Sequence, residues 1–296
     1  MGFKEELARQ ANMVDEALNE YLPKAGSYPP LIHEAMRYSV FAGGKRLRPA
    51  LVLAGARAVG GDEKSVLQAA CAIELLHTYS LVHDDLPAMD NDDFRRGNPT
   101  NHKVYGEAMA VLAGDALLTL AFGLLAGVSQ TGSFGADRVV RVIAEVAEAA
   151  GTAGLIGGQV VDMQSTGKSI DKQTLEYIHV HKTGALYRAS VRTGAILAGA
   201  APEQLYHLTV YAENLGLAFQ IVDDILDIAG DEQKLGKPIG SDTKNQKATY
   251  PALHGLAAAR SIARQAAEQA NGALASFGAE ADFLRGLVCF VINREY

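Results

Sequence analysis

The sequence predicts an all-α protein, an antiparallel bundle of about ten or more helices in one domain. Long segments carry apolar residues at helical spacing, and no β-hairpin or βαβ pattern is evident along the chain. Hydrophobic residues make up 48% of the composition, aromatic residues 7%, and Trp is absent. The core must therefore be built mostly from Ala, Leu, Val and Ile, which suits closely packed helices.

The chain is expected to be one domain spanning residues 1–296, because no linker-like stretch divides it, although the length alone would allow two. The formal net charge of −7 argues against nucleic acid as a partner. Cys71 and Cys289 are predicted to be buried thiols in a reducing compartment. The first residues lack an apolar signal-peptide core, so a cytoplasmic location is expected.

The first predicted helix is amphipathic and ends before Pro23, with Leu7, Ala11, Val14 and Leu18 on one face. Glycine, proline and polar runs separate the later apolar segments. The further helices are expected at residues 30–41, 49–83 with a break at 60–62, 108–128, 138–151, 177–192, 212–228, 252–270 and 279–293.

The segment 108–128 is the most hydrophobic and is long enough to raise the question of a membrane span. Asp115 lies near its middle, where a carboxylate would be costly in lipid. We therefore predict a buried helix and a protein that is not membrane-embedded.

A cluster of carboxylates ends the helix predicted at 49–83, with Asp84, Asp85 and Asp90 close together. Such carboxylates repel one another unless a cation lies among them. The candidate ligands are hard oxygens without a Cys, which favours Mg²⁺ over Zn²⁺. Mg²⁺ often completes its shell with phosphate oxygens, so a phosphorylated substrate is a hypothesis. The alternative is a solvated acidic loop neutralised by Arg95 and Arg96.

A second acidic motif lies in the helix predicted at 212–228. Its polar positions are i, i+3, i+4 and i+7, which form one stripe of an α-helix, and the positions between them are apolar. These positions are Gln220, Asp223, Asp224 and Asp227. The stripe is expected to face something polar inside the molecule, and a second motif favours the metal site over the solvated loop.

A basic segment, GGKRLRP, occupies residues 43–49, and Pro49 is predicted to open a helix at its first position. Lys45, Arg46 and Arg48 oppose the helix macrodipole, so a bound anion explains them better than helix stability. The segment is not a Walker loop, because its Gly-Lys pair is followed by Arg. A surface basic patch is the alternative.

In the helix predicted at 177–192, Lys182 and Thr183 precede a glycine, a pattern that can kink the backbone and place a cation beside a cavity. His179 and His181 point to different sides of a helix, which favours packing or surface roles over a metal site.

Gly157 and Gly158 mark a point of close packing. Gln159 and Asp162 share one helical face, and they either support a pocket behind the metals or pair helices. The polar stretch 230–251 is a candidate lid over a phosphate site.

Together, these separated motifs resemble the trans-isoprenyl diphosphate synthases, most closely the bacterial farnesyl diphosphate synthases, over essentially the whole chain. The resemblance implies an isoprenoid synthase fold around a deep central cavity, and a homodimer. It also implies Mg²⁺-dependent condensation of isopentenyl diphosphate with dimethylallyl or geranyl diphosphate in trans, releasing pyrophosphate. The main product would be farnesyl diphosphate (C15), and a geranylgeranyl diphosphate synthase of the same family is the alternative.

The resemblance also implies roles for individual residues. Isopentenyl diphosphate would bind at Lys45, Arg48, His77 and Arg96. The allylic diphosphate would bind at Arg95, Lys182, Thr183, Gln220, Lys237 and Lys247. Catalysis would rest on Lys182, Thr183, Gln220 and Arg95. Three Mg²⁺ ions would bridge the substrate diphosphate and Asp84, Asp85, Asp90, Asp223, Asp224 and Asp227.

Product length is expected to depend on Tyr79, which lies five residues before Asp84. At helical rise its ring lies about 7 Å below the metal-bound head group, with the small Ser80 beside it. A growing prenyl tail would meet Tyr79 first, and in the family an aromatic residue at this position goes with C15 products. The alternative is a core aromatic that touches no ligand.

Three other functions stay open. A class I terpene cyclase has no need for a second diphosphate site at Lys45, Arg48 and His77. A metal phosphohydrolase using His83 and Asp84 would leave the second acidic helix without a purpose. A structural cation-binding protein would need no basic residues.

Overall fold

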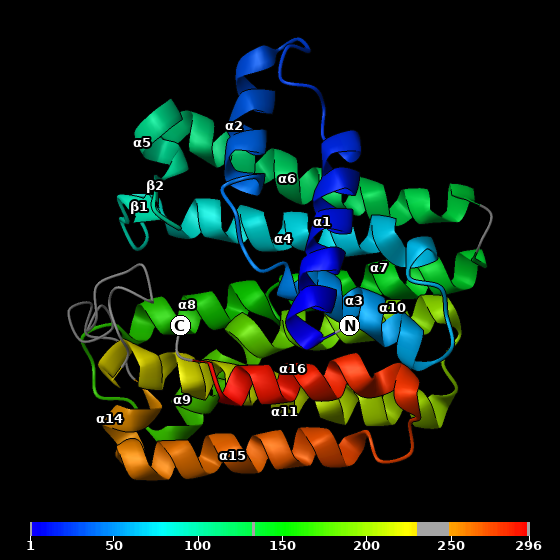
Figure 1. Cartoon of the computed structure of the whole chain (residues 1–296). Helices are drawn as coiled ribbons and strands as arrows, with labels where there is room; N and C mark the ends of the chain where they lie inside the picture. The colour runs from blue at the N-terminus through cyan, green and yellow to red at the C-terminus, as the bar shows by residue number, and fades with distance from the viewer. Residues whose placement is uncertain (1, 132–133, 230–248, 295–296) are drawn as a thin grey trace.

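Helices make up nearly all the secondary structure in the computed structural model, which describes residues 2–131, 134–229 and 249–294 (Figure 1). The predicted all-α class is confirmed. The helices are α1 (Phe3–Tyr21), α2 (Pro30–Val40), α3 (Leu47–Ala58), η1 (Lys64–Val66), α4 (Leu67–Asp84), α5 (Asn101–Tyr105), α6 (Glu107–Gly127), η2 (Val128–Thr131), α7 (Ala136–Ala150), α8 (Leu155–Ser165), α9 (Lys172–Ile178), the π-helix η3 (His179–Gly184), α10 (Ala185–Ala198), α11 (Pro202–Ala229), α14 (Tyr250–His254), α15 (Leu256–Ala273), η4 (Ala279–Ala281) and α16 (Asp282–Ile292).

A small β-hairpin follows the first aspartate-rich segment, so the expectation of no hairpin was wrong. Strands β1 (Phe94–Arg95) and β2 (Asn98–Pro99) pair antiparallel. The two residues between them, Arg96 and Gly97, both have positive φ, 53° and 80°, as a tight hairpin turn requires. Two-residue strands are too short to show alternation in the sequence.

Two helices begin earlier than predicted. Helix α3 starts at Leu47, so Pro49 occupies its third position and not its first. Proline is still tolerated there, because the first four N–H groups of a helix have no intrahelical partner. Helix α11 starts at Pro202, and its 28 residues extend well before the predicted start at residue 212.

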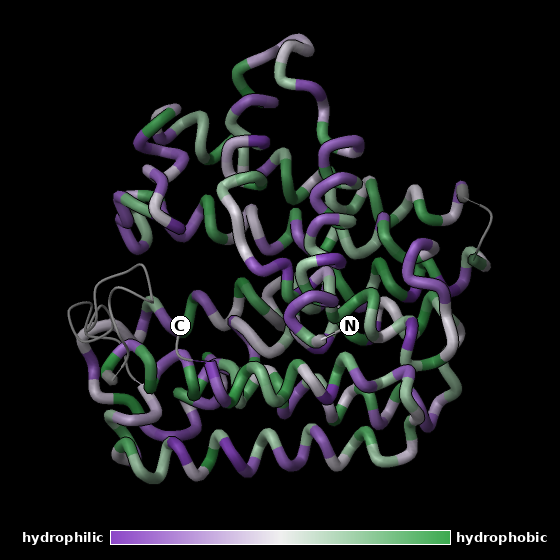
Figure 2. The backbone as a smooth tube through the Cα atoms, viewed as in Figure 1, coloured by the Kyte–Doolittle hydropathy of each residue, from purple (hydrophilic) through white to green (hydrophobic). Residues whose placement is uncertain are grey.

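Small residues let the central helices approach closely. Helix α10 packs against α3 on one side and α11 on the other. A Cβ added to Gly55 would overlap the carbonyl oxygen of Val191, and one added to Gly194 would overlap that of Val52. The outer helix α15 alternates hydrophobic and hydrophilic positions (Figure 2), and its buried positions are all alanines. The core of mostly Ala, Leu, Val and Ile predicted from composition is therefore present.

The two aspartate-rich segments lie at the same side of the molecule. Helices α4 and α11 run in the same direction in Figure 1, and each carries its carboxylates at or near its C-terminal end. The expected deep central cavity stays a prediction.

The two cysteines differ in environment. Cys71 is buried in the core, and burial raises the pKa of its thiol. Cys289 is exposed, which corrects the prediction that both are buried. Its neighbours on α16, Leu287 and Val288, are buried in the core instead.

Among the described residues, two helices are long and apolar enough to cross a membrane by length and composition. They span Lys64–Asp84 and Glu107–Gln130. Within the apolar 18-residue stretch of each helix, 72% and 39% respectively is buried in the fold. The prediction of a buried helix at 108–128 is therefore wrong for one face of α6, where Val111 and Leu112 are 41% and 53% exposed. Asp115 also points outward. That the protein is not membrane-embedded stays a prediction.

Candidate functional site

The first aspartate-rich segment folds back on the end of α4. The backbone N–H of Asp90 donates to the carbonyl oxygen of Asp84 at 2.9 Å, and that of Asn91 donates to Leu86 at 3.1 Å. Asn91 has φ +54°, a left-handed conformation that Asn tolerates well. The excursion expected between the two carboxylates is thus a tight loop that returns Asp90 to the helix end.

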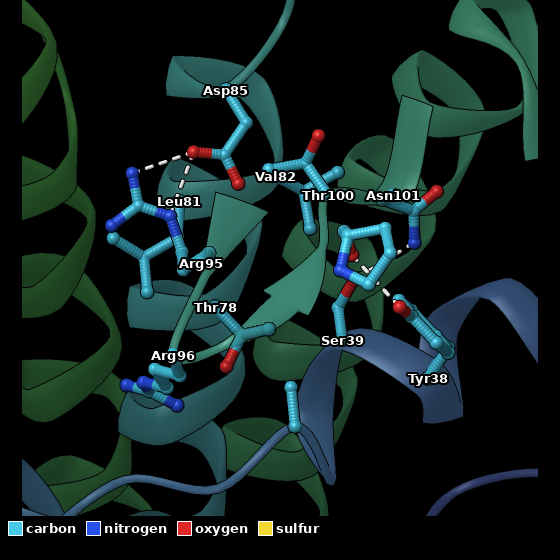
Figure 3. Close-up of a pocket in the computed structure, with 12 residues that line it drawn as sticks. Tyr38, Ser39, Thr78, Leu81, Val82, Asp85, Arg95, Arg96, Thr100 and Asn101 are labelled. Carbon is cyan, nitrogen blue, oxygen red and sulfur yellow. Dashed lines mark hydrogen bonds and ion pairs between the residues drawn. The ribbon is translucent and has the colours of Figure 1, made fainter. Parts of the chain in front are cut away.

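Asp85 is buried and forms an ion pair with Arg95 (Figure 3). Arg95 Nε donates to Asp85 Oδ1 at 2.7 Å, and its guanidinium also reaches Asp92 at 3.3 Å. Burial raises the pKa of Asp85, while Arg95 opposes that rise. In this structure Asp85 orients Arg95, and its expected role as a metal ligand stays a prediction.

A cavity of about 30 Å³ lies between α2, α4 and the hairpin (Figure 3). Hydrogen bonds across it fix the hairpin: Tyr38 Oη donates to Pro99 O at 2.8 Å, and Asn101 Nδ2 donates to Ser39 Oγ at 2.8 Å. These contacts hold the hairpin that carries Arg95, and the start of α5, against α2.

Arg96 reaches from the hairpin to the basic segment. Its guanidinium donates to the carbonyl oxygen of Gly43 and lies where a side chain on Gly44 would be. Gly44 has φ +130°, so glycine is required there for its conformation as well as for space. The hairpin and the basic segment, far apart in sequence, therefore form one surface.

One of the three predicted anion-binding cations is structural. Arg46 is 3% exposed and adopts φ +50° at the start of α3. It forms ion pairs with Asp15 and Glu74, both at 2.8 Å, and donates to Val40 O at 2.6 Å. Arg46 thus ties α3 to α1 and α4, and is not available to a ligand.

Lys45 and Arg48 lie over aromatic rings instead. Lys45 Nζ is 5.4 Å from the centre of the Phe290 ring, and Arg48 Cζ is 5.0 Å from that of Tyr187. Desolvation lowers the pKa of Lys45, and Arg294 adds to that effect.

His77 is the fourth residue of the site predicted for isopentenyl diphosphate, with Lys45, Arg48 and Arg96. Burial lowers its pKa well below 6.5, and the positive charges of Arg48, Arg96 and Arg95 lower it further. The imidazole is therefore neutral at pH 7, in a strongly positive environment suited to an anion. Ser80 donates to the backbone carbonyl of His77 at 2.9 Å, which holds its hydroxyl on the helix.

The predicted kink at Lys182 and Thr183 is present as the π-helix η3, a feature common at functional sites. Gly158 of α8 packs directly on it, because a Cβ there would overlap the backbone nitrogen of Lys182. Lys182 Nζ forms an ion pair with Asp162 at 2.6 Å. Close packing at Gly158 is therefore confirmed, and the ion pair joins α8 to η3. That Asp162 supports a pocket behind the metals stays a prediction.

A hydrogen-bond chain joins η3 to the second acidic motif. Thr183 Oγ1 donates to Gln220 Oε1 at 3.0 Å, and Gln220 Nε2 donates to Asp224 Oδ1 at 3.2 Å. These bonds fix the orientation of the amide, so its dipole has a defined direction. Thr183 and Gln220, predicted to act together, are brought together.

The predicted acidic stripe divides into two environments. Asp224 is 3% exposed, accepts a hydrogen bond from the backbone N–H of Tyr250 at 2.9 Å, and lies 3.8 Å from His179 Nε2. Asp227 is 1% exposed. The Asp223 side chain is 45% exposed and pairs with Arg294 at 2.9 Å. Asp223 is thus the most accessible of the three carboxylates.

Arg294 is a site residue that the sequence did not reveal. Its guanidinium lies 4.1 Å over the Phe219 ring and donates to Phe219 O and to Asp223 Oδ1. It follows the last apolar helix in a polar terminus, where no periodicity or motif singles it out.

His83 points towards α6. Its Nε2 lies 3.0 Å from Val111 O on α6, and a Cβ on Gly114 would overlap its ring. Its other face packs edge-on against Tyr79 at 5.8 Å. This orientation argues against a His83–Asp84 metal pair.

Within the described residues, no three Asp, Glu, His or Cys side chains are grouped closely enough to hold a metal ion. The carboxylates of Asp84, Asp90 and Asp223 are hard-oxygen donors without a competing thiol, so they fit Mg²⁺ whose remaining ligands come from elsewhere. Lys237 and Lys247 lie outside the described residues.

Known proteins share this combination of fold and motifs. Residues 29–279 match the polyprenyl synthetase family. The chain is 52% identical over 254 residues to farnesyl diphosphate synthase of Geobacillus stearothermophilus, covering 86% of this chain and 85% of that protein. It is 48% identical over 289 residues to geranylgeranyl diphosphate synthase of Cyanophora paradoxa, covering 97% and 95%.

Solved structures agree. The crystal structure of geranylgeranyl pyrophosphate synthetase from Pyrococcus horikoshii Ot3 superposes with a TM-score of 0.91 at 33% identity, covering 99% of this chain and 98% of that one. Fold and motifs thus define a prenyltransferase of the all-α isoprenoid synthase type. The chain belongs to the polyprenyl synthetase family, which confirms the resemblance drawn from the sequence.

Proposed function

We propose that the protein condenses isopentenyl diphosphate with dimethylallyl or geranyl diphosphate in trans, with Mg²⁺, releasing pyrophosphate and giving mainly farnesyl diphosphate. The carrying observation is that cationic side chains lie on two different parts of the site. Arg48 and Arg96 lie near His77 of α4, and Lys182 lies on η3, where it pairs with Asp162. Two separate anion sites suit two diphosphate substrates, whereas a terpene cyclase or a phosphohydrolase needs one.

Mg²⁺ held by Asp84, Asp90 and Asp223 would supply positive charge to the departing diphosphate. Lys182 and Arg95, each oriented by a carboxylate partner, would add to that charge. Three such ions and a direct role for Asp85, Asp224 and Asp227 are part of the proposal.

The chain's neutral dipoles suit an allylic cation. The amide of Gln220 is oriented by Thr183 and Asp224, so it can stabilise the cation without capturing it. A nucleophilic side chain is unnecessary, and exclusion of water protects the cation. The released pyrophosphate is the proposed base. The lowered pKa of His77 makes its imidazole a weak base, so it is not assigned this role.

The C15 product is supported by Tyr79. The residue is 4% exposed, and its ring is packed against His83, so it cannot easily move out of the path of a tail. Burial raises its pKa to about 12, and the phenol stays neutral. Relatives named for farnesyl and for geranylgeranyl products both match the chain, so geranylgeranyl diphosphate is the second candidate product.

A homodimer is also proposed. Helix α6 exposes Val111 and Leu112 beside Ala108, an apolar surface that a second copy of the chain can cover. Light scattering after size-exclusion chromatography should give twice the mass of 31.4 kDa. A cytoplasmic location is part of the same proposal.

The decisive assay mixes the protein with isopentenyl and dimethylallyl diphosphates and Mg²⁺, then separates the dephosphorylated products by chromatography. C15 alcohol is expected, and omission of isopentenyl diphosphate should abolish it. A hydrocarbon formed from an allylic diphosphate alone would indicate a cyclase. Phosphate release without condensation would indicate a phosphohydrolase.

A further inference from the structure

Tyr187, which no sequence motif singled out, lies beneath Arg48. It is 1% exposed in α10, and the Arg48 guanidinium carbon lies 5.0 Å from its ring centre. Its ring centre lies 5.2 Å from that of Phe219, and the Arg294 guanidinium lies over the Phe219 ring. Arg48, Tyr187, Phe219 and Arg294 thus form a chain of contacts in which two cations flank two aromatic rings tilted by 41°.

The hydroxyl of Tyr187 contributes little to this arrangement. It is buried and has no hydrogen-bond partner among the described residues. Burial also raises the pKa of Tyr187 to about 12, so the phenol is neutral and offers Arg48 no anionic charge. The interaction with Arg48 is therefore carried by the face of the ring.

Arg48 needs such a support. Its Nε is buried without a hydrogen-bond partner among the described residues, so that nitrogen does not fix the plane of the guanidinium. The Tyr187 ring is 1% exposed and contacts the tilted Phe219 ring of the next helix, so its own position is fixed by packing. Cation–π contacts of this kind strengthen when both groups are desolvated.

We propose that Tyr187 is a positioning residue, whose ring holds the Arg48 guanidinium in the orientation that binds isopentenyl diphosphate. The proposal rests on the proposed function. It assigns a specificity role to a side chain that touches Arg48 and is not itself a catalytic residue.

The test compares Tyr187→Phe, which keeps the ring, with Tyr187→Leu, which removes it. The Leu variant should raise KM for isopentenyl diphosphate by about three- to thirty-fold, the range of a partly desolvated cation–π contact. Its KM for dimethylallyl diphosphate should change less than about twofold. The Phe variant should keep the wild-type KM for isopentenyl diphosphate. Tyr187→Met is a second variant without the ring, to be used if Tyr187→Leu impairs folding.

A double-mutant cycle with Arg48→Ala isolates the contact. Once Arg48 is gone, adding Tyr187→Leu should change KM for isopentenyl diphosphate no further. Equal losses in the Phe and Leu variants, full additivity in the cycle, or equal effects on both substrates would each overturn the proposal.

Failure of the proposed function would be recognised separately, because the wild-type protein would then form no condensation product. In that case calorimetric titration with inorganic pyrophosphate still tests the positioning role. Weaker binding is expected for the Leu variant and not for Phe, and equal binding by both would overturn the proposal.

Discussion

Lys182 and Asp162 form a 2.6 Å ion pair across the contact between η3 and α8, with both side chains largely shielded from solvent. The pair holds the ammonium group at one place on the π-helix. The backbones are in direct contact at Gly158, so the two elements have little freedom to separate.

Asp162→Asn should therefore lower kcat/KM for the allylic substrate by about tenfold or more, because it weakens a charge-assisted hydrogen bond that orients Lys182. The KM for isopentenyl diphosphate should stay near its wild-type value. Steady-state kinetics with each substrate varied in turn provide the measurement. An equal rise in both KM values would show that Asp162 acts on the fold and not on Lys182.

Substitution of the accessible carboxylates should be far more damaging. Asp84→Ala, Asp90→Ala and Asp223→Ala are each expected to reduce turnover by about a thousandfold or more at saturating Mg²⁺, since each removes charge from the transition state. Asp224→Ala should in addition lower the thermal midpoint, because Asp224 also accepts a hydrogen bond from the backbone N–H of Tyr250. Near-normal turnover for Asp223→Ala would contradict the metal assignment.

Variants of Arg48 and Lys182 should affect different substrates in steady-state kinetics. Arg48→Ala is expected to raise KM for isopentenyl diphosphate mainly, because Arg48 lies with His77 and Arg96. Lys182→Ala should instead lower kcat and the affinity for the allylic diphosphate. If each variant changed the kinetic constants for both substrates alike, this assignment of the two residues would be contradicted.

Tyr79→Ala should shift the product from C15 towards C20 or longer while ionisation continues. The ring is 4% exposed and packs against His83 of the same helix, so its removal should open space where the tail is proposed to extend. Chromatography of dephosphorylated products from the variant and from Ser80→Ala provides the comparison. An active Tyr79→Ala enzyme that makes C15 alone would place the end of the tunnel elsewhere.

His77 predicts a pH dependence of stability. Its folded pKa is lowered by burial and by the neighbouring arginines, so the unfolded chain takes up the proton first as the pH falls. The neutral imidazole's contribution to the free energy of unfolding is complete above about pH 6.5. It is lost as the pH falls towards the pKa of His77 in the folded protein. Urea unfolding at about pH 7.5 and 5.5 should show that the wild type loses more stability than His77→Gln. A larger loss in the variant would contradict the assignment.

Local sequence patterns predicted much of this protein. The apolar spacing identified the long helices, because a face buried along a helix recurs every 3.6 residues whatever it packs against. The acidic and basic motifs were visible for a similar reason, since their side chains are neighbours along the chain. Lys182 and Thr183 could be placed at a distorted helix because a glycine follows them.

Partners far apart in sequence could not be predicted in this way. Arg46 looked like an anion-binding residue, but the packing of α3 on α4 places Glu74 against it. Asp85 likewise pairs with Arg95 because the hairpin folds back on α4.

The sequence by itself therefore determined the all-α class, the family and the segments that carry the charge. The tertiary structure decided which charged groups pair with an opposite charge and which lie over an aromatic ring, as with Arg294 on Asp223 and Arg48 on Tyr187. The physical reason is that electrostatic and cation–π energies depend on distance and burial, and both are set by how the helices pack rather than by position along the chain.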